Sequence, residues 1–204
     1  MINFFMRIFF VIAFMLTGFL VFAQEKPEGL FINSKAPEFK EKDQNGKEIS
    51  LKELRKKRPV VLIFYRGNWC PYCSKYLKAL EDSLLQIKDM GAELIAITPE
   101  AADGVSKTIE KTKASYSIIS DKDLKIMKAY QVAYQVDERT IGRYKTAGID
   151  LAQNNNQKPD KVFLPVPAIY IINKDGEISY RFFDPDYKKR ASVKEILSNL
   201  VGMK

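Results

Sequence analysis

The two cysteines of this chain lie three positions apart in the stretch GNWCPYCSKYL, residues 67 to 77. Cys70 and Cys73 are the only thiols among 204 residues. Two sulfur atoms at this spacing can close a short disulfide, and either one can attack a disulfide or an oxidant bound at the other. The spacing therefore predicts reversible thiol–disulfide chemistry at this pair.

The neighbouring residues are of types that favour a reactive sulfur. Pro71 suits the first position of a helix, because its missing N–H would have no partner there. Cys70 would then lie near the helix N-cap, where backbone N–H groups and the helix dipole favour a thiolate. Cys73 follows one turn later on the same face. Arg66 would add positive potential, and Trp69 would shield one side of the site.

A metal site or a structural bridge at the pair fits the sequence less well. A zinc site needs further ligands, but the chain has no histidine and no third cysteine, so we expect neither a metal nor a cofactor. A structural bridge over so short a loop would remove little chain entropy, and a domain of this length can bury its own core. Cys73 alone could be a buried core thiol, which is compatible with a redox role for the pair.

The elements on either side of the pair explain how it would be positioned. Pro59 to Tyr65, PVVLIFY, is an apolar run typical of a central strand that is buried on both faces. From Pro71 the period becomes helical, and Gly91 provides the stop. The apolar stripe of this predicted helix consists of Cys73, Tyr76, Leu77, Leu80, Leu84 and Ile87.

Strand and helix signals alternate along the rest of the chain. Asn45-Gly46 predicts a β-hairpin, Ser50 and Glu53 form a capping box, and Ser120 is expected to cap a helix over 124–130. Strands are expected at 93–98, 116–119, 168–173 and 177–183, helices at 99–114 and 192–201, and a polar loop with short helical pieces at 133–162. This order predicts an α/β domain, with parallel strands, crossover helices and a terminal hairpin in one mixed sheet.

The N-terminal segment has the layout of a secretory signal peptide. Arg7 precedes an apolar run from Ile8 to Leu20, and Val21-Phe22-Ala23 offers a cleavage site before polar residues begin. We expect cleavage after Ala23, an extension over residues 24–34, one domain over 35–204, and a periplasmic or secreted protein. The alternative is an uncleaved N-terminal membrane anchor, although the apolar run is shorter than the ~20 residues of a spanning helix.

The charge of the chain does not indicate a nucleic-acid partner. The formal net charge is +8, but lysines and arginines are interleaved with acidic residues along the chain. The densest basic run, KELRKKR at 52–58, is explained by a solvated helix end. We expect no nucleic-acid binding, and contact with a membrane only through the signal segment.

The stretch VVLIFYRGNWCPYC resembles the thioredoxin superfamily, and more closely its alkyl hydroperoxide reductase/thiol-specific antioxidant (AhpC/TSA) branch, the peroxiredoxin-like proteins. Ala36-Pro37-Glu38-Phe39, LPVPAIYIINKDGEI at 164–178, and Asp184-Pro185-Asp186-Tyr187 continue the resemblance, which runs from about Ala36 to the C-terminus. It implies a thioredoxin-like fold, with a central mixed β-sheet flanked by helices and an added N-terminal β-hairpin.

The chain departs from both patterns that it resembles. The peroxiredoxin pattern puts Cys73 at the peroxidatic position and Cys70 at a threonine, whereas the thioredoxin pattern makes Cys70 the exposed nucleophile. Pro167 stands where peroxiredoxins carry an arginine, for which Arg66 could substitute. Thioredoxins have a cis proline there, so we expect a cis Val166–Pro167 bond; the alternative is a trans proline entering an edge strand. Phe64 occupies the place of the buried acid of thioredoxins.

The resemblance implies a thiol-dependent peroxidase that cycles Cys70 and Cys73 between dithiol and disulfide. Its substrate would be a peroxide, and a thioredoxin-like donor would supply electrons. The alternative is an exported thiol–disulfide oxidoreductase that acts on protein disulfides. A third hypothesis is a redox-inert binding module, against which both intact cysteines argue. The sequence leaves open which cysteine attacks first, which donor serves, and whether the chain dimerises.

Overall fold

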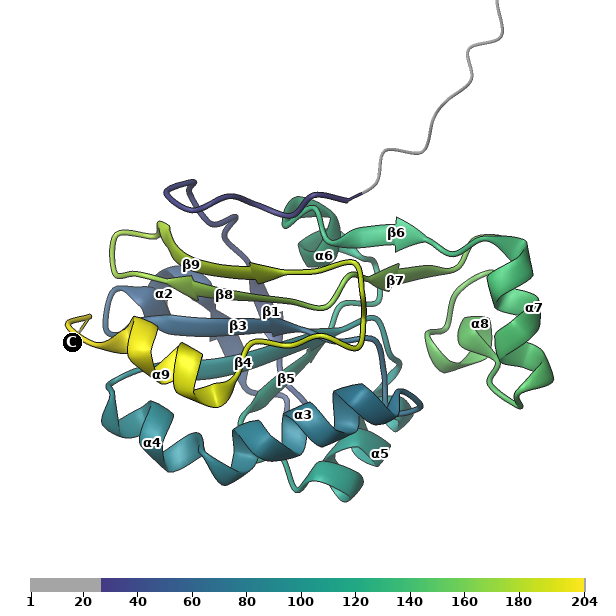
Figure 1. The fold of residues 1–204 in the computed structure, drawn as a ribbon, viewed down its shortest axis with the longest axis horizontal. Helices are drawn as coiled ribbons and strands as arrows, with labels where there is room; N and C mark the ends of the chain where they lie inside the picture. The colour runs from purple at the N-terminus through teal and green to yellow at the C-terminus, as the bar shows by residue number, and fades with distance from the viewer. Residues whose placement is uncertain (1–26, 204) are drawn as a thin grey trace, which may run out of the picture.

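A five-stranded mixed sheet forms the centre of the fold (Figure 1). A computed structural model describes residues 27–203, so the predicted signal peptide lies outside the described residues. The strand order is β5-β4-β3-β8-β9. The parallel strands are β3 (Val60–Phe64), β4 (Glu93–Thr98) and β5 (Ser117–Ser120), and the antiparallel strands are β8 (Ala168–Ile172) and β9 (Ile178–Phe183).

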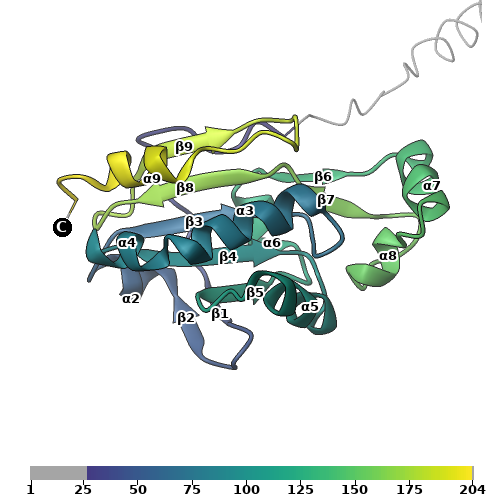
Figure 2. The ribbon, with the colours of Figure 1, turned by 60° about the horizontal axis from the view of Figure 1, so that its bottom comes forward.

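Helices cover both faces of this sheet, as Figures 1 and 2 show. One face packs against α3 (Pro71–Asp82), α4 (Leu84–Asp89), α5 (Ala102–Thr112) and α9 (Val193–Leu200), and the other against α2 (Leu51–Arg55) and α6 (Lys125–Ala129). All five residues of β3 are buried, because apolar side chains of both helical layers meet its alternating faces. The expected thioredoxin-like α/β architecture is confirmed.

The predicted helix after the cysteines is two helices instead of one. Its apolar stripe is buried as expected except for the half-buried Tyr76, but α3 ends at Asp82 and α4 begins at Leu84. Ser83 between them leaves the helical conformation at φ −110° and ψ 9°, and its N–H turns back to the carbonyl of Leu80 at 3.2 Å. The periodicity predicts the buried face of this segment but does not detect the local break.

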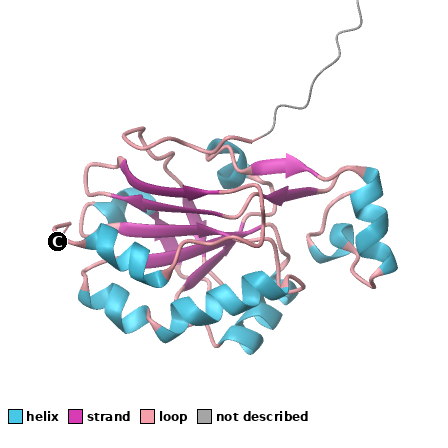
Figure 3. Ribbon diagram, viewed as in Figure 1, coloured by secondary structure: helices cyan, strands magenta, loops and turns pink. Residues whose placement is uncertain are grey.

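The N-terminal hairpin forms as predicted, with β1 (Lys40–Lys42) antiparallel to β2 (Glu48–Ser50) in a sheet of their own (Figure 3). Gly46 in its turn has φ +75°, a conformation that favours glycine. The Ser50 hydroxyl caps α2 by accepting from the N–H of Glu53 at 3.4 Å. The cap predicted at Ser50 is therefore confirmed.

The cap predicted at Ser120 is wrong. Ser120 ends β5, and its hydroxyl donates to the carbonyl of Glu100. At the start of α6 it is Asp121 that accepts, from the N–H of Met127 at 2.8 Å. Leu124 precedes the helix in a left-handed conformation at φ +59°, so the chain turns twice before α6 begins. The sequence spacing identifies the helix but assigns its acceptor one residue too early.

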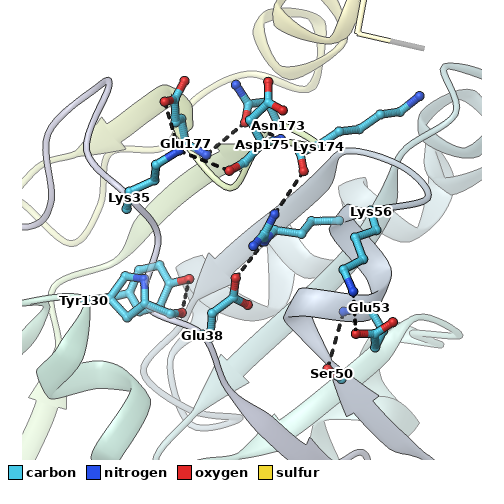
Figure 4. A network of polar contacts seen from close by, with 12 residues as sticks. Lys35, Glu38, Ser50, Glu53, Lys56, Tyr130, Asn173, Lys174, Asp175 and Glu177 are labelled. Carbon is cyan, nitrogen blue, oxygen red and sulfur yellow. Dashed lines mark hydrogen bonds and ion pairs between the residues drawn. The ribbon is translucent and has the colours of Figure 1, made fainter.

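A set of polar contacts joins the N-terminal segment to the β8–β9 turn (Figure 4). Lys35 pairs with Glu177 at 3.0 Å, and Arg55 pairs with Glu38 at 2.6 Å. These partly exposed pairs each contribute at most about 1 kcal/mol to stability. Since Ile172 pairs with Val60 at the start of β3, this turn lies at the end of the sheet opposite the cysteines. These contacts hold the N-terminal segment against the β8–β9 turn and do not reach the cysteines.

The segment predicted as a polar loop at 133–162 is a folded lobe. Together with the strand that follows, it holds β6 (Ala133–Gln135), α7 (Glu138–Thr146), α8 (Leu151–Asn154) and β7 (Phe163–Pro165). The sequence indicates both short helices but not the antiparallel β6–β7 pair. Five buried residues form a small core for this lobe: Val136, Leu151, Ala152, Val162 and Leu164. Figure 1 shows α7 and α8 at one end of the sheet.

Among residues 27–203, no helix has both the length and the apolar character needed to cross a bilayer. Over the same residues, no group of three or more potential metal-ligating Cys, Asp, Glu or His side chains is gathered in one place.

Candidate active site at the cysteine pair

The cysteine pair lies where the chain leaves β3 and enters α3. Cys70 is the N-cap residue of α3 with an extended backbone, φ −92° and ψ 107°, and Pro71 occupies the first turn. The carbonyl of Cys70 accepts from the N–H groups of Cys73 at 3.0 Å and Ser74 at 3.1 Å, which starts the helix. The local arrangement predicted from Cys-Pro-Tyr-Cys is therefore present.

Both thiols are free, and their sulfur atoms are close together. The Cys73 Sγ donates to the Cys70 Sγ across 2.7 Å. A disulfide bond measures about 2.05 Å, so a small movement would bring the pair to bonding distance. Cys70 is 2% exposed and Cys73 1%, so the protein covers the pair almost completely. The Cys70–Cys73 disulfide itself stays a prediction.

The two sulfurs have opposite proton affinities. The hydrogen bond from the Cys73 thiol lowers the pKa of Cys70 to about 6, with further help from the Cys73 backbone and the charges of Arg66 and Arg190 against the effect of burial. The Cys70 sulfur accepts no capping hydrogen bond from the first turn, so the Cys73 backbone N–H acts on it from beyond hydrogen-bond distance. Burial raises the pKa of Cys73. Cys70 is therefore the readier thiolate.

Arg66 lies beside Cys70, as the sequence suggested, inside a cage of aromatic rings. Its guanidinium carbon is 4.9 Å from the ring centre of Trp69, 5.5 Å from that of Tyr144 and 4.3 Å from that of Tyr187. Its Nη2 donates to the Tyr144 hydroxyl at 2.5 Å, and its Nε and Nη1 are buried without a partner in the described structure. The charge is held by ring faces and is not neutralised by a carboxylate.

Trp69 shields the site by packing against the lobe. Its ring meets that of Tyr144 edge-on, with centres 5.2 Å apart. Trp69 is also in contact with the small apolar core of the lobe. The segment 133–165 thus packs against Trp69 and Arg66 beside the cysteine pair, a position that its polar sequence did not indicate.

Arg190 is a functional candidate that the sequence reasoning missed. Its Nη2 lies 3.5 Å from the Cys73 Sγ. It belongs to the loop 184–192 between β9 and α9, which also carries Tyr187. The Asp-Pro-Asp-Tyr motif marks this loop as part of the resemblance, but only the fold shows that it reaches the cysteines.

Glu100 is a second group that the sequence did not single out. It follows β4, is fully buried, and accepts from the Asn68 N–H at 2.7 Å, the Asn68 side chain at 2.6 Å and the Thr108 hydroxyl at 3.2 Å. Burial raises the pKa of this carboxyl, against its hydrogen bonds. Glu100 brings a carboxyl beneath the loop before the cysteines.

Gly67 allows that loop to approach Glu100. It has φ +153°, and a Cβ at this position would lie 2.4 Å from the Trp69 Nε1 and 3.0 Å from the Glu100 Oε1. Any larger residue would therefore displace Trp69 or the buried carboxyl. Glu100 and Gly67 together fix the path of the chain from β3 to Cys70.

The cis bond predicted at Val166–Pro167 is wrong, since every peptide bond of the described residues is trans. The Val166 N–H donates to the Val132 carbonyl at 2.8 Å, which continues the β6–β7 pairing up to the start of β8. The chain passes extended from one strand to the next, so no tight turn requires the cis form, and the trans form is the more stable. Pro167 is buried at this junction.

The profile described as "AhpC/TSA family" matches residues 32–181, most of the described structure. The chain belongs to the AhpC/TSA family. This family member is 33% identical over 130 residues to the chloroplastic peroxiredoxin Q of Gentiana triflora, covering 61% of this chain and 59% of that protein. It is 36% identical over 131 residues to the chloroplastic peroxiredoxin Q of Arabidopsis thaliana, covering 62% and 60%. The matches span about three fifths of the length of these relatives.

Solved structures share the fold of this AhpC/TSA protein. Peroxidoxin BcpB from Mycobacterium tuberculosis superposes with a TM-score of 0.64 at 16% identity, covering 85% of this chain and 97% of the other. The reduced 2-Cys peroxiredoxin of Plasmodium vivax gives a TM-score of 0.62 at 18% identity, covering 84% and 94%. The thioredoxin-like fold is thus shared with peroxiredoxins. The arginines and aromatic rings around the cysteine pair are observed in this chain, and the comparison of folds does not extend to them.

Proposed function

We propose that this protein is a thiol-dependent peroxidase in which Cys70 attacks first and Cys73 resolves. The observation that carries the proposal is the sulfur pair itself, 2.7 Å apart at the start of α3 with the lower pKa on Cys70. Family membership and the peroxiredoxin Q relatives support peroxide as the substrate. The trans Pro167 and the buried thiols favour a small oxidant over a protein disulfide.

The proposed cycle has three steps. The Cys70 thiolate attacks the peroxide oxygen, the O–O bond breaks, and the alkoxide or hydroxide that leaves takes up a proton, so that Cys70 becomes a sulfenic acid. The Cys73 thiolate then attacks the Cys70 sulfur, and hydroxide leaves to form water with the proton that Cys73 lost. A thioredoxin-type dithiol returns the disulfide to two thiols by exchange.

Trp69 provides a direct test, because it is the only tryptophan of the chain and packs beside the site. Reduced protein is mixed with hydrogen peroxide and, separately, with a protein disulfide, while its fluorescence is followed. We expect rapid change with peroxide, which Cys70→Ser abolishes, and a single trapped turnover in Cys73→Ser. Slow peroxide consumption beside fast disulfide exchange would instead favour the exported thiol–disulfide oxidoreductase.

We also propose that the chain is exported, on the sequence of residues 1–23. Its reductant would then be a thioredoxin-type protein outside the cytoplasm. The arrangement of a short basic start, an apolar run and Val21-Phe22-Ala23 supports cleavage after Ala23 over an N-terminal anchor.

A further inference from the structure

Arg190 contacts Cys73, whose sulfur is the less readily deprotonated of the two. Its Nη2 is 3.5 Å from the Cys73 Sγ, while its Nη1 donates to the carbonyls of Tyr187 at 2.5 Å and Lys189 at 2.6 Å. The two carbonyl contacts fix the guanidinium within its own loop. The remaining nitrogen faces the sulfur, so the arrangement presents a positive charge to Cys73.

This charge is not neutralised by an acid. Among residues 27–203, Arg190 takes part in no ion pair, and the nearby acids have other partners. Asp184 of the same loop pairs with Lys189 at 3.0 Å, and Glu195 accepts from the Tyr180 hydroxyl at 2.8 Å. The Arg190 guanidinium lies 5.8 Å from the ring centre of Tyr76, which does not compensate its charge. Its field therefore acts on the sulfur.

The second step of the proposed cycle needs this charge. Cys73 is 1% exposed, and an anion in such a setting is costly unless a positive group pairs with it. Before oxidation, the Cys73 thiol donates its proton in a hydrogen bond to the Cys70 sulfur. Once Cys70 is a sulfenic acid, Cys73 must lose that proton and attack, and Arg66 lies in the aromatic cage beside the other sulfur.

We propose that Arg190 is a catalytic residue of the resolving step, where its guanidinium stabilises the Cys73 thiolate that attacks the Cys70 sulfenic acid. This inference rests on the proposed peroxidase function. In the step the S–S bond forms and the S–O bond of Cys70 breaks. The departing hydroxide combines with the proton released by Cys73. Arg190 forms no covalent bond and exchanges no electrons in this step.

Rapid mixing with hydrogen peroxide separates the two steps. Trp69 fluorescence follows two phases, first the formation of the Cys70 sulfenic acid and then the closure of the disulfide. A dimedone-type reagent traps the sulfenic acid, and mass spectrometry detects the adduct. In Arg190→Gln we expect the first phase within about two-fold of wild type and disulfide closure slower by about ten-fold or more, because a charge-assisted hydrogen bond is lost. Sulfenic acid and its over-oxidised forms then accumulate. Arg190→Lys keeps the charge and recovers part of the closure rate.

Lys188→Gln is the matched control, since it removes the same charge from an exposed position of the same loop. We expect it to leave both phases unchanged. Closure at the wild-type rate in Arg190→Gln overturns the assignment, and so does equal slowing of both phases in Arg190→Gln and Arg190→Lys, which would mean that the residue only holds the loop. A wild-type protein that forms no sulfenic acid would instead overturn the peroxidase function itself.

Discussion

At the residue scale, the two cysteines differ more than their shared motif suggests. Cys70 stands at the N-cap and accepts a hydrogen bond, whereas Cys73 lies one turn inside and donates it. Arg66 and Arg190 come from loops that are distant in sequence, and the charges of both act on Cys70, while Arg190 also contacts the Cys73 sulfur. In the proposed cycle this asymmetry assigns attack to Cys70 and resolution to Cys73, and it makes the protonation of the pair a measurable property.

The reactivity of Cys70 should follow the pKa of about 6 that its surroundings give it. Since the thiolate is the reactive form, its alkylation should be fast above that pH and fall as the pH drops through it. Cys73→Ala should move the midpoint up toward that of an ordinary thiol, because the Cys73 hydrogen bond is the largest cause of the lowered pKa. Cys73→Ser, which keeps a donor, should move it less.

Peptide mapping after alkylation at a series of pH values measures this profile for each sulfur separately. A midpoint that stays the same in Cys73→Ala would show that the hydrogen bond between the thiols does not control Cys70.

The buried Glu100 predicts a pH dependence of stability. Its folded pKa is raised above the unfolded value of 4.5, so its contribution to stability is present below that value and is lost as the pH rises through the folded pKa. Glu100→Gln cannot ionise and can still accept from Asn68. Between about pH 4 and about pH 8 the variant should therefore gain unfolding free energy relative to wild type.

Urea unfolding across this pH range measures the difference. Glu110→Gln, at an exposed position of α5 without an ion pair among the described residues, is the control and should show no such trend. A difference between Glu100→Gln and wild type that does not change with pH would contradict the raised pKa.

Local sequence predicts the part of the site that local structure builds. Cys70, Cys73, Pro71, Trp69 and Arg66 lie within eight positions of one another, and a strand followed by a helix is enough to place them. Arg190, Tyr187, Tyr144 and Glu100 reach the site only through tertiary packing. No spacing rule connects them to the cysteines, so a single sequence cannot indicate them.

At the element scale, periodicity predicts buried faces better than it predicts ends and breaks. The stripe of α3 and α4 follows the expected positions, because each apolar side chain gains by facing the sheet. The break at Ser83 and the cap at Asp121 depend on single hydrogen bonds that no periodic pattern encodes. The lobe is hard to predict for a related reason, since its core is small and its outer surface is polar.

The lobe should control access to the cysteine pair. Tyr144 provides both an edge-on contact with Trp69 and the hydroxyl that accepts from Arg66. Tyr144→Ala removes about 1 kcal/mol of aromatic pairing beyond the loss of buried area, so the lobe should loosen. We expect Trp69 emission to shift to longer wavelength and alkylation of Cys70 to become several-fold faster.

Lys145→Ala, at the next and exposed position of α7, is the control for this measurement. If Tyr144→Ala left both the emission and the alkylation rate unchanged, the lobe would be packed against the site without covering it.

At the scale of the whole molecule, the order of elements determines where the site lies. Parallel β3, β4 and β5 place their C-terminal ends at one edge of the sheet, and antiparallel β8 begins at that edge, with Phe64 opposite Ala168. The strand and helix order predicts this arrangement, since crossover connections leave few topologies. The isomer of Val166–Pro167 was not predictable, because it depends on the pairing of Val166 with Val132.

The start of the described fold also bears on the predicted cleavage. Gly29 donates to the carbonyl of Gln131 at 3.1 Å, and the N–H of Leu30 donates to the Tyr170 hydroxyl at 3.1 Å, so the chain is tied to the domain within a few residues of Ala23. Removing residues 1–23 would leave all these contacts in place.

We therefore expect the exported protein to begin at Gln24, and intact-mass measurement of the secreted or periplasmic fraction checks this. Ala23→Arg should block processing, because the cleavage site requires a small residue, while Glu25→Gln should not. Recovery of wild-type protein only in the membrane fraction, with Met1 retained, would support the N-terminal anchor instead.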